Sequence, residues 1–167
     1  MPVHHAIWRV GDTPQPLTIS KLVSESLLER MILNDPTILS DQWMIIGHQE
    51  NTLDKGRIDL LAIAPDASLI LIELKRDRTP REVVAQALDY ASWVDDLTAD
   101  RLSQIYEKFS GGGNLGDAFK QRFNTELEEE SINQSHQIII VAAELDPSTE
   151  RIVDYLSKNG ISINVLF

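Results

Sequence analysis

The sequence predicts an α/β fold in which helices cover a mixed β-sheet, part antiparallel and part parallel. Three strand-like runs, 43–49, 58–64 and 69–74, follow one another with only short turns between them, which is typical of an antiparallel meander. The later runs 138–143 and 161–167 are separated by a helical segment, and such a connection implies parallel pairing through a right-handed crossover. The predicted order is helix, three strands, helix, a helical insertion, strand, helix and strand.

The N-terminal part predicts a short edge strand and one amphipathic helix. The apolar stretch 6–10 forms the strand and ends at a turn rich in glycine and proline. Ser20 is a suitable N-cap for a helix that runs to about Asn34, where Asp35-Pro36 stops it. Its apolar residues recur at helical spacing and are expected on the buried side: Leu22, Val23, Leu27, Leu28, Met31 and Ile32.

The middle of the chain carries the strongest local signals. Residues 69–72 read Leu-Ile-Leu-Ile, which is continuous rather than alternating, as in a strand buried on both faces. The segment 79–82 then combines Thr79 at the N-cap, Pro80 at the first helical position and Glu82 at the third, which is a capping box. This helix is predicted to run to about Leu97. Its expected core face is Val84, Ala87, Leu88, Ala91 and Val94.

The last third of the chain predicts helices at about 99–109 and 115–127, which together form an insertion of about 98–130. Asp146-Pro147 then starts a helix that runs to about Lys158 between the last two strands. We therefore expect a single domain over 1–167. The end on a strand leaves open whether the natural chain continues.

Composition and charge exclude several classes of protein. The chain has no cysteine, so disulfides and thiolate chemistry are excluded. It shows no apolar run of bilayer length and no secretory signal, so we expect a cytoplasmic protein with no membrane partner. The net charge of −11 argues against a protein that coats nucleic acid nonspecifically, although a carboxylate site for a metal is itself locally acidic.

Glu73 and Lys75 are two positions apart in one predicted strand, so their side chains share a face of the sheet. Burying both is costly unless they pair or bind something. Asp59, in the preceding strand, faces Glu73 only if the loop around Asp66 has an odd number of residues or a bulge. Two carboxylates and a lysine suit phosphodiester hydrolysis, with hard oxygen ligands for Mg²⁺ or Mn²⁺.

These residues resemble the signature of the PD-(D/E)XK nuclease superfamily, which has a restriction-endonuclease-like fold. Gly56-Arg57-Ile58-Asp59 followed by Ile72-Glu73-Leu74-Lys75 looks like its D…ExK motif, with Ile58 in place of the proline. Gln86 to Tyr90 is similar to the QxxxY motif of the RecB-type branch, and the wording of 56–94 is similar to a bacterial group of endonuclease-like proteins. The resemblance implies a metal held by Asp59, Glu73 and the Leu74 carbonyl. It also implies Lys75 as the catalytic lysine, with Gln86 and Tyr90 orienting the site or the DNA backbone.

The first helix and the segment after Lys75 add further candidates. Related nucleases often supply a glutamate from the first helix, and of Glu25 and Glu29, which lie one turn apart, Glu29 is favoured. Three arginines after Lys75, joined by Arg57, are expected to contact DNA phosphates: Arg76, Arg78 and Arg81. Salt bridges to nearby acids are the alternative for these arginines, and Trp93 is expected to flank the core.

The leading hypothesis is a Mg²⁺-dependent deoxyribonuclease with DNA as its partner. The alternative is a non-catalytic module that keeps the nuclease fold to bind nucleic acid or protein. An acidic protein that mimics or avoids nucleic acid is also compatible with the charge, but it leaves the set of metal-site residues unexplained. The sequence leaves the oligomeric state open, a homodimer included.

Overall fold

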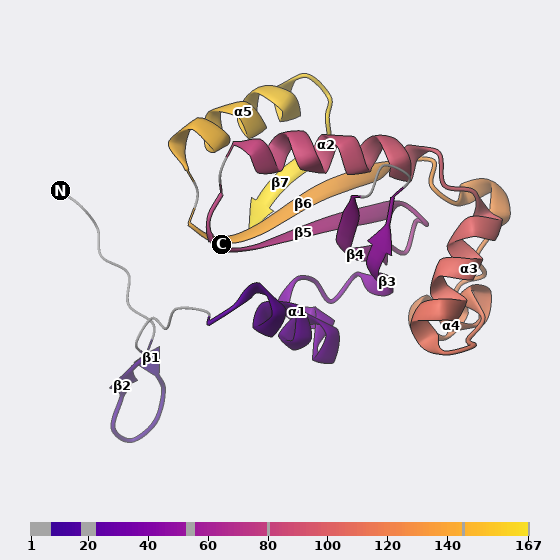
Figure 1. Ribbon diagram of the computed structural model, residues 1–167. Helices are drawn as coiled ribbons and strands as arrows, with labels where there is room; N and C mark the ends of the chain where they lie inside the picture. The colour runs from indigo at the N-terminus through magenta and orange to yellow at the C-terminus, as the bar shows by residue number, and fades with distance from the viewer. Residues whose placement is uncertain (1–7, 18–22, 53–55, 80, 145, 167) are drawn as a thin grey trace.

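A five-stranded mixed sheet forms the centre of the molecule, with the strand order β3-β4-β5-β6-β7 (Figure 1). The structure is a computed structural model that describes residues 8–17, 23–52, 56–79, 81–144 and 146–166. Its elements are β1 Trp8–Arg9, β2 Gln15–Pro16, α1 Glu25–Asn34, a 3-10 turn Pro36–Ile38, β3 Met44–Asn51, β4 Arg57–Ile63, β5 Leu69–Arg78, α2 Glu82–Asp95, α3 Ala99–Ser110, α4 Leu115–Phe123, a 3-10 turn Glu129–Ser131, β6 His136–Glu144, α5 Pro147–Lys158 and β7 Ile163–Leu166. The pairs β3/β4 and β4/β5 are antiparallel, and β5/β6 and β6/β7 are parallel, so the predicted mixed α/β sheet is confirmed.

Helices cover both faces of the sheet. Figure 1 shows α2 and α5 on one face and α1 on the other, with α3 and α4 at the β3 side. The apolar side chains form two clusters accordingly: Leu61 and Leu71 pack under α2 and α5, whereas Leu60 and Ile72 pack against α1. Of the core face predicted for α2, Val84, Ala87, Ala91 and Val94 are buried, and Leu88 is partly buried against the same cluster.

The hairpin between β4 and β5 has the odd loop that the site requires. Leu60 pairs with Ile72 and Ile63 pairs with Leu69, so the strands are centred on Asp66. The five residues between the paired positions Ile63 and Leu69 make the turn, and Ala67 adopts a positive φ of 63° there. The pairs end at Leu60 and Ile72, and Asp59 and Glu73 are the next residues along the two strands.

The first helix begins later than its sequence pattern predicts. Ser20 lies outside the described residues. The helix starts at Glu25, and its N-cap is Ser24, whose Oγ accepts a hydrogen bond from the Leu27 N–H (3.1 Å). The prediction that Val23 and Met31 lie on the buried side is wrong, because they are 78% and 42% exposed. Val23 precedes the helix, and the buried stripe is narrow, formed by Leu28 and Ile32 one turn apart.

The predicted capping box at Thr79 is also wrong. The N-cap of α2 is Arg81, which makes no side-chain capping hydrogen bond. Thr79 is fully buried instead, where its Oγ1 accepts from the Asp146 N–H (3.1 Å) and its carbonyl accepts from the Thr149 hydroxyl (3.1 Å). Its hydroxyl therefore ties the end of β5 to the start of α5, and this long-range contact replaces the local cap.

The remaining predicted elements are present with small shifts. Asp146 caps α5 by accepting a hydrogen bond from the Ser148 N–H (2.9 Å). Helix α4 ends at Phe123, four residues before the predicted end, because Asn124 turns into the left-handed conformation. The predicted strand 6–10 contains β1, which pairs only with β2, and residues 6 and 7 lie outside the described part. In that described part, none of the helices combines the length and apolarity needed to cross a bilayer.

Candidate active site

Two adjacent cavities lie where α1, β4, β5 and α2 meet. The larger has a volume of about 480 Å³ and is lined by Glu25, Asn51, Arg57, Asp59, Glu73, Lys75, Gln86 and Tyr90. The smaller, of about 230 Å³, is lined by Glu25, Ser26, Glu29, Gln49, Arg57, Asp59 and Leu74. The structure therefore brings the predicted Asp59, Glu73, Lys75, Gln86 and Tyr90 into one cavity, and Asp59 belongs to both.

Asp59 lies where β4 departs from regular strand alternation. Ile58 packs in the cluster under α2, but Leu60, two residues later, packs in the opposite cluster. The β4–β5 pairs end at Leu60, and Asp59 Oδ2 accepts a hydrogen bond from the Leu74 N–H (2.8 Å) in place of a ladder bond. Since the N–H and C=O of one residue in a strand point to the same edge, the Leu74 carbonyl faces the Asp59 side as well.

Glu73 is a buried carboxylate in which one oxygen accepts hydrogen bonds and the other has no hydrogen-bond partner. Its Oε1 accepts hydrogen bonds from Lys75 Nζ and from Gln86 Nε2, both at 2.8 Å. Its Oε2 is buried and has no hydrogen-bond partner. Burial, together with the charge of Asp59, raises the pKa of Glu73 to about 7. The site is thus built around an ionisable group that the fold alone does not stabilise as an anion.

The metal-free protein should therefore lose stability as the pH rises. Because the folded pKa of Glu73 is about 7 against an ordinary 4.5, the neutral acid stabilises the fold below pH 4.5. This contribution, on the order of 3 kcal/mol, is lost as the pH rises through 7. A Glu73→Gln variant stays neutral and should be more stable than the wild type at pH 8 but not at pH 4. Urea unfolding in EDTA at both pH values tests this, and an identical pH dependence of the two proteins would contradict it.

The two other charged groups beside Glu73 respond to the same environment. Burial raises the pKa of Asp59, against the lowering effect of the Leu74 hydrogen bond and the charge of Lys75. Burial lowers the pKa of Lys75, but its hydrogen bond to Glu73 and the surrounding carboxylates outweigh this, so the pKa lies above its ordinary value. Lys75 is therefore a cation in the site at neutral pH.

Gln86 and Tyr90 form a chain of hydrogen bonds from Glu73 to the β3–β4 hairpin. Gln86 Nε2 donates to Glu73 and also to the Tyr90 hydroxyl (3.0 Å), which accepts a second bond from the Arg57 N–H (3.2 Å). Both bonds use lone pairs of the hydroxyl oxygen, so its proton remains available to another acceptor. Tyr90 is 7% exposed and Trp93 packs against the same core cluster, as expected for a core-flanking residue.

Gly56 permits this contact because a side chain there would meet Tyr90. A Cβ at this position would lie 2.4 Å from Tyr90 Cε1 and 2.6 Å from Thr52 Oγ1. A Gly56→Ala variant should displace the ring and break the bond to the Arg57 N–H, with a loss of about 1–3 kcal/mol in unfolding free energy. Denaturant unfolding checks the size of the loss. The matched control is Gly11→Ala, since a Cβ at Gly11 meets nothing within 4 Å, and equal stability losses would contradict the steric explanation.

The first helix presents Glu25, and not the favoured Glu29, to the larger cavity. Glu25 Oε1 accepts a hydrogen bond from the Arg76 N–H (3.1 Å), which joins the start of α1 to the end of β5. Glu29 lines the smaller cavity with Asp59, where it accepts from Gln49 Nε2 and lies 3.1 Å from His48 Nε2. Glu25 lines the smaller cavity as well, so both glutamates adjoin Asp59 there.

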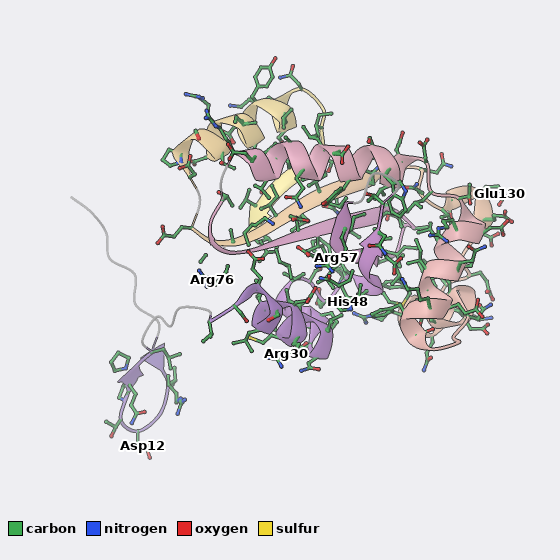
Figure 2. All side chains as sticks on the ribbon, in the orientation of Figure 1. Asp12, Arg30, His48, Arg57, Arg76 and Glu130 are labelled. Atoms are coloured by element: carbon green, nitrogen blue, oxygen red, sulfur yellow. The ribbon has the colours of Figure 1, made fainter. Side chains whose placement is uncertain are left out.

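Of the predicted phosphate-binding arginines, Arg57 lines the cavities of this site, and Arg76 and Arg81 line neither. Arg57 lines both cavities, and Figure 2 shows it between the sheet and α1, with Arg76 at the far end of β5. Arg81 is exposed and lies 3.5 Å from Glu82, and the side chain of Arg78 lies outside the described part. Asn51, which no motif singles out, also lines the larger cavity because it pairs with Arg57 across the β3–β4 hairpin.

The donor atoms suit a hard divalent cation. Two carboxylates and one strand carbonyl are oxygen ligands, and Mg²⁺ is usually held by one or two carboxylates with waters in its other positions. The buried Glu73 Oε2 has no donor of its own, as a metal-binding oxygen requires. Among the described residues, no group of three or more acidic or histidine side chains is arranged to hold a metal, so a cation here would depend on Asp59, Glu73 and the Leu74 carbonyl.

Solved structures with a similar fold include a repair endonuclease and EndoMS. A repair endonuclease from Pyrococcus abyssi matches 89% of this chain and 49% of its own, with a TM-score of 0.51 and 17% identity. EndoMS in a complex with double-stranded DNA matches 97% of this chain and 64% of its own, with a TM-score of 0.52 and 14% identity. EndoMS in its apo form matches over the same shares with a TM-score of 0.50 and 15% identity.

At these identities the likeness establishes the fold. The chain spans 49% to 64% of the length of these structures. No protein-family model matches the sequence, and no curated protein sequence matches it. The resemblance to the RecB-type branch stays a prediction.

Proposed function

We propose that this chain is a divalent-metal-dependent deoxyribonuclease that hydrolyses phosphodiester bonds. The observation that carries the proposal is the meeting of Asp59, Glu73 and Lys75 in one cavity, with the buried Glu73 Oε2 left without a hydrogen-bond donor. A structural ion pair needs only Glu73 and Lys75. It does not account for a second carboxylate whose charge raises the pKa of the first.

Each residue has a role that its contacts support. Asp59, Glu73 and the Leu74 carbonyl would hold Mg²⁺ or Mn²⁺. The cation when bound stabilises charge on the phosphate and lowers the pKa of a water. Lys75 has an ammonium group that donates to the attacking water or to a phosphate oxygen. Gln86 fixes the orientation of the Glu73 carboxylate, and the free proton of the Tyr90 hydroxyl is available to the substrate.

DNA is the substrate that the surroundings favour. Arg57 lines both cavities with Asp59, Arg76 follows Lys75 in β5, and the comparison structures include an endonuclease described in complex with double-stranded DNA. The net charge of −11 indicates that binding depends on this local set of cations and not on a basic surface. We therefore expect weak binding away from a productive substrate, and only a modest loss of binding with salt, because few phosphates are contacted.

Metal titration with an electrophoretic cleavage assay tests the proposal. Single-stranded, duplex and branched DNA are incubated with the protein in Mg²⁺, in Mn²⁺ and in EDTA. We expect at least one form to be cut with metal, and none to be cut in EDTA. If folded protein cuts no form in either metal, the nuclease proposal is wrong. A gel-shift assay in the same buffers then shows whether the chain is instead a module that binds DNA without cutting it.

A further inference from the structure

Strand β3 breaks its alternation next to the candidate site. A Cβ on Gly47 would lie 2.9 Å from Ile105 of α3, and Glu50 accepts a hydrogen bond from Lys108 of the same helix (3.1 Å). Positions three apart in a regular strand point to opposite faces, so one residue between them is irregular. His48 and Gln49 are adjacent, yet both side chains reach Glu29 on the opposite side, so the strand is kinked at this point although its register with β4 is unchanged from His48 to Glu50.

The irregular residue is Gln49, whose φ is +54°. This left-handed conformation is disfavoured for a side chain of this kind because the Cβ crowds the carbonyl. The pairs on either side, His48 with Leu60 and Glu50 with Ile58, place Gln49 directly opposite Asp59. The other described non-glycine residues with positive φ lie outside the strands, namely Ala67, Asn124 and Asn133. Strained backbone inside a strand is typical of functional sites.

The strained residue acts on Glu29. Gln49 Nε2 donates to Glu29 Oε1, and His48 Nε2 lies 3.1 Å from the same oxygen. Figure 2 shows His48 between the sheet and α1. The Glu29 side chain is only 15% exposed, and its charge contributes to the raised pKa of Asp59. Without these partners, a glutamate on an amphipathic helix gains rotamer freedom by turning to water.

We propose that Gln49 is a positioning residue that holds the Glu29 carboxylate beside Asp59, and that its left-handed conformation within β3 serves the site and not the fold. This inference rests on the proposed nuclease function. Gln49 acts through Glu29, so its loss should lower the turnover of the site and its affinity for metal, and it should leave DNA binding unchanged. Changes to the partners that orient metal-site carboxylates typically cost 10- to 100-fold in affinity or activity.

The test compares two variants that suit a positive φ but lack the reach of glutamine. Gln49→Gly removes the side chain and relieves the backbone, and Gln49→Asn keeps an amide that is one methylene shorter. For both we expect kcat and the calorimetric affinity for Mn²⁺ to fall about tenfold, with KM for DNA unchanged. The Tm of Gln49→Gly should stay the same or rise by up to about 3 °C. Asn124→Gly is the control, because it relieves a positive φ at an exposed helix end that lines neither cavity.

The outcomes distinguish a failure of the positioning role of Gln49 from a failure of the proposed nuclease function. If the wild type cuts no DNA in either metal, the proposed function fails before the variants are compared. If the wild type is active and both Gln49 variants stay within twofold of it, the positioning role is wrong. A Tm drop of more than about 5 °C in both variants would show that Gln49 supports the fold and would overturn the inference. A raised KM with unchanged kcat would also overturn it, because Gln49 would then contact the DNA directly.

Discussion

An Asp59→Asn variant is expected to lose at least about 1000-fold in DNA cleavage while keeping its thermal stability. The carboxamide oxygen of asparagine still accepts the hydrogen bond that the Leu74 N–H donates to Asp59, so the local fold is kept. The anionic oxygen that would hold the metal is lost. Burial already raises the pKa of Asp59, so a neutral isostere at this position removes a charge that the fold disfavours.

Cleavage rates with Mg²⁺ and Mn²⁺, and calorimetric titration of Mn²⁺, measure the two consequences together. Asp89→Asn is the matched control, because Asp89 lies on the exposed side of α2, lines neither cavity and should change neither rate nor affinity. Wild-type cleavage by a folded Asp59→Asn protein would mean that this carboxylate is not part of the nuclease site. An unchanged Mn²⁺ affinity would show that residues other than Asp59 hold the metal.

The parts of the fold that the sequence predicts well are those governed by local apolar patterns and by whether a hairpin loop has an odd or even number of residues. Continuous apolar runs mark β5 and β6 because both faces of these strands are covered. The odd loop around Asp66 follows from requiring Asp59 and Glu73 on one face, and the observed register has that centre. The core face of α2 follows from helical periodicity in the same way.

The failures arise where a distant contact overrides a local preference. Thr79 has the sequence signature of a helix cap, but its hydroxyl oxygen accepts a hydrogen bond from the Asp146 N–H instead. The role of Glu29 stays a prediction: Glu25 reaches the larger cavity and Glu29 the smaller one, and this placement depends on where α1 sits along β5. Periodicity fixes the face of a helix but not its position along its axis. The strain at Gln49 has no sequence signal at all, since left-handed positions are usually recognised by glycine or asparagine.

A Lys75→Met variant should lose about 100- to 1000-fold in kcat, with little change in KM for DNA. Methionine keeps most of the length of the side chain but removes the ammonium group that lies 2.8 Å from Glu73 Oε1. Arg57, which lines both cavities, and Arg76, next to Lys75 in β5, keep their charge, so the affinity for DNA should change little. The loss should therefore appear in the chemical step, as expected for a group that donates to the attacking water or the phosphate.

The same variant separates a catalytic lysine from a structural one. Lys158→Met is the matched control, since Lys158 is 79% exposed on α5 and lies 3.9 Å from Asp154 as a surface pair. If Lys75 only neutralises Glu73, a double variant that also carries Glu73→Gln should recover the stability that Lys75→Met loses. If Lys75 acts on the substrate, the ammonium contributes beyond the ion pair, and Lys75→Met by itself is inactive even when Mn²⁺ binds with wild-type affinity. Cleavage within tenfold of the wild type by folded Lys75→Met protein would assign the lysine to the ion pair and leave the chemistry to the carboxylates.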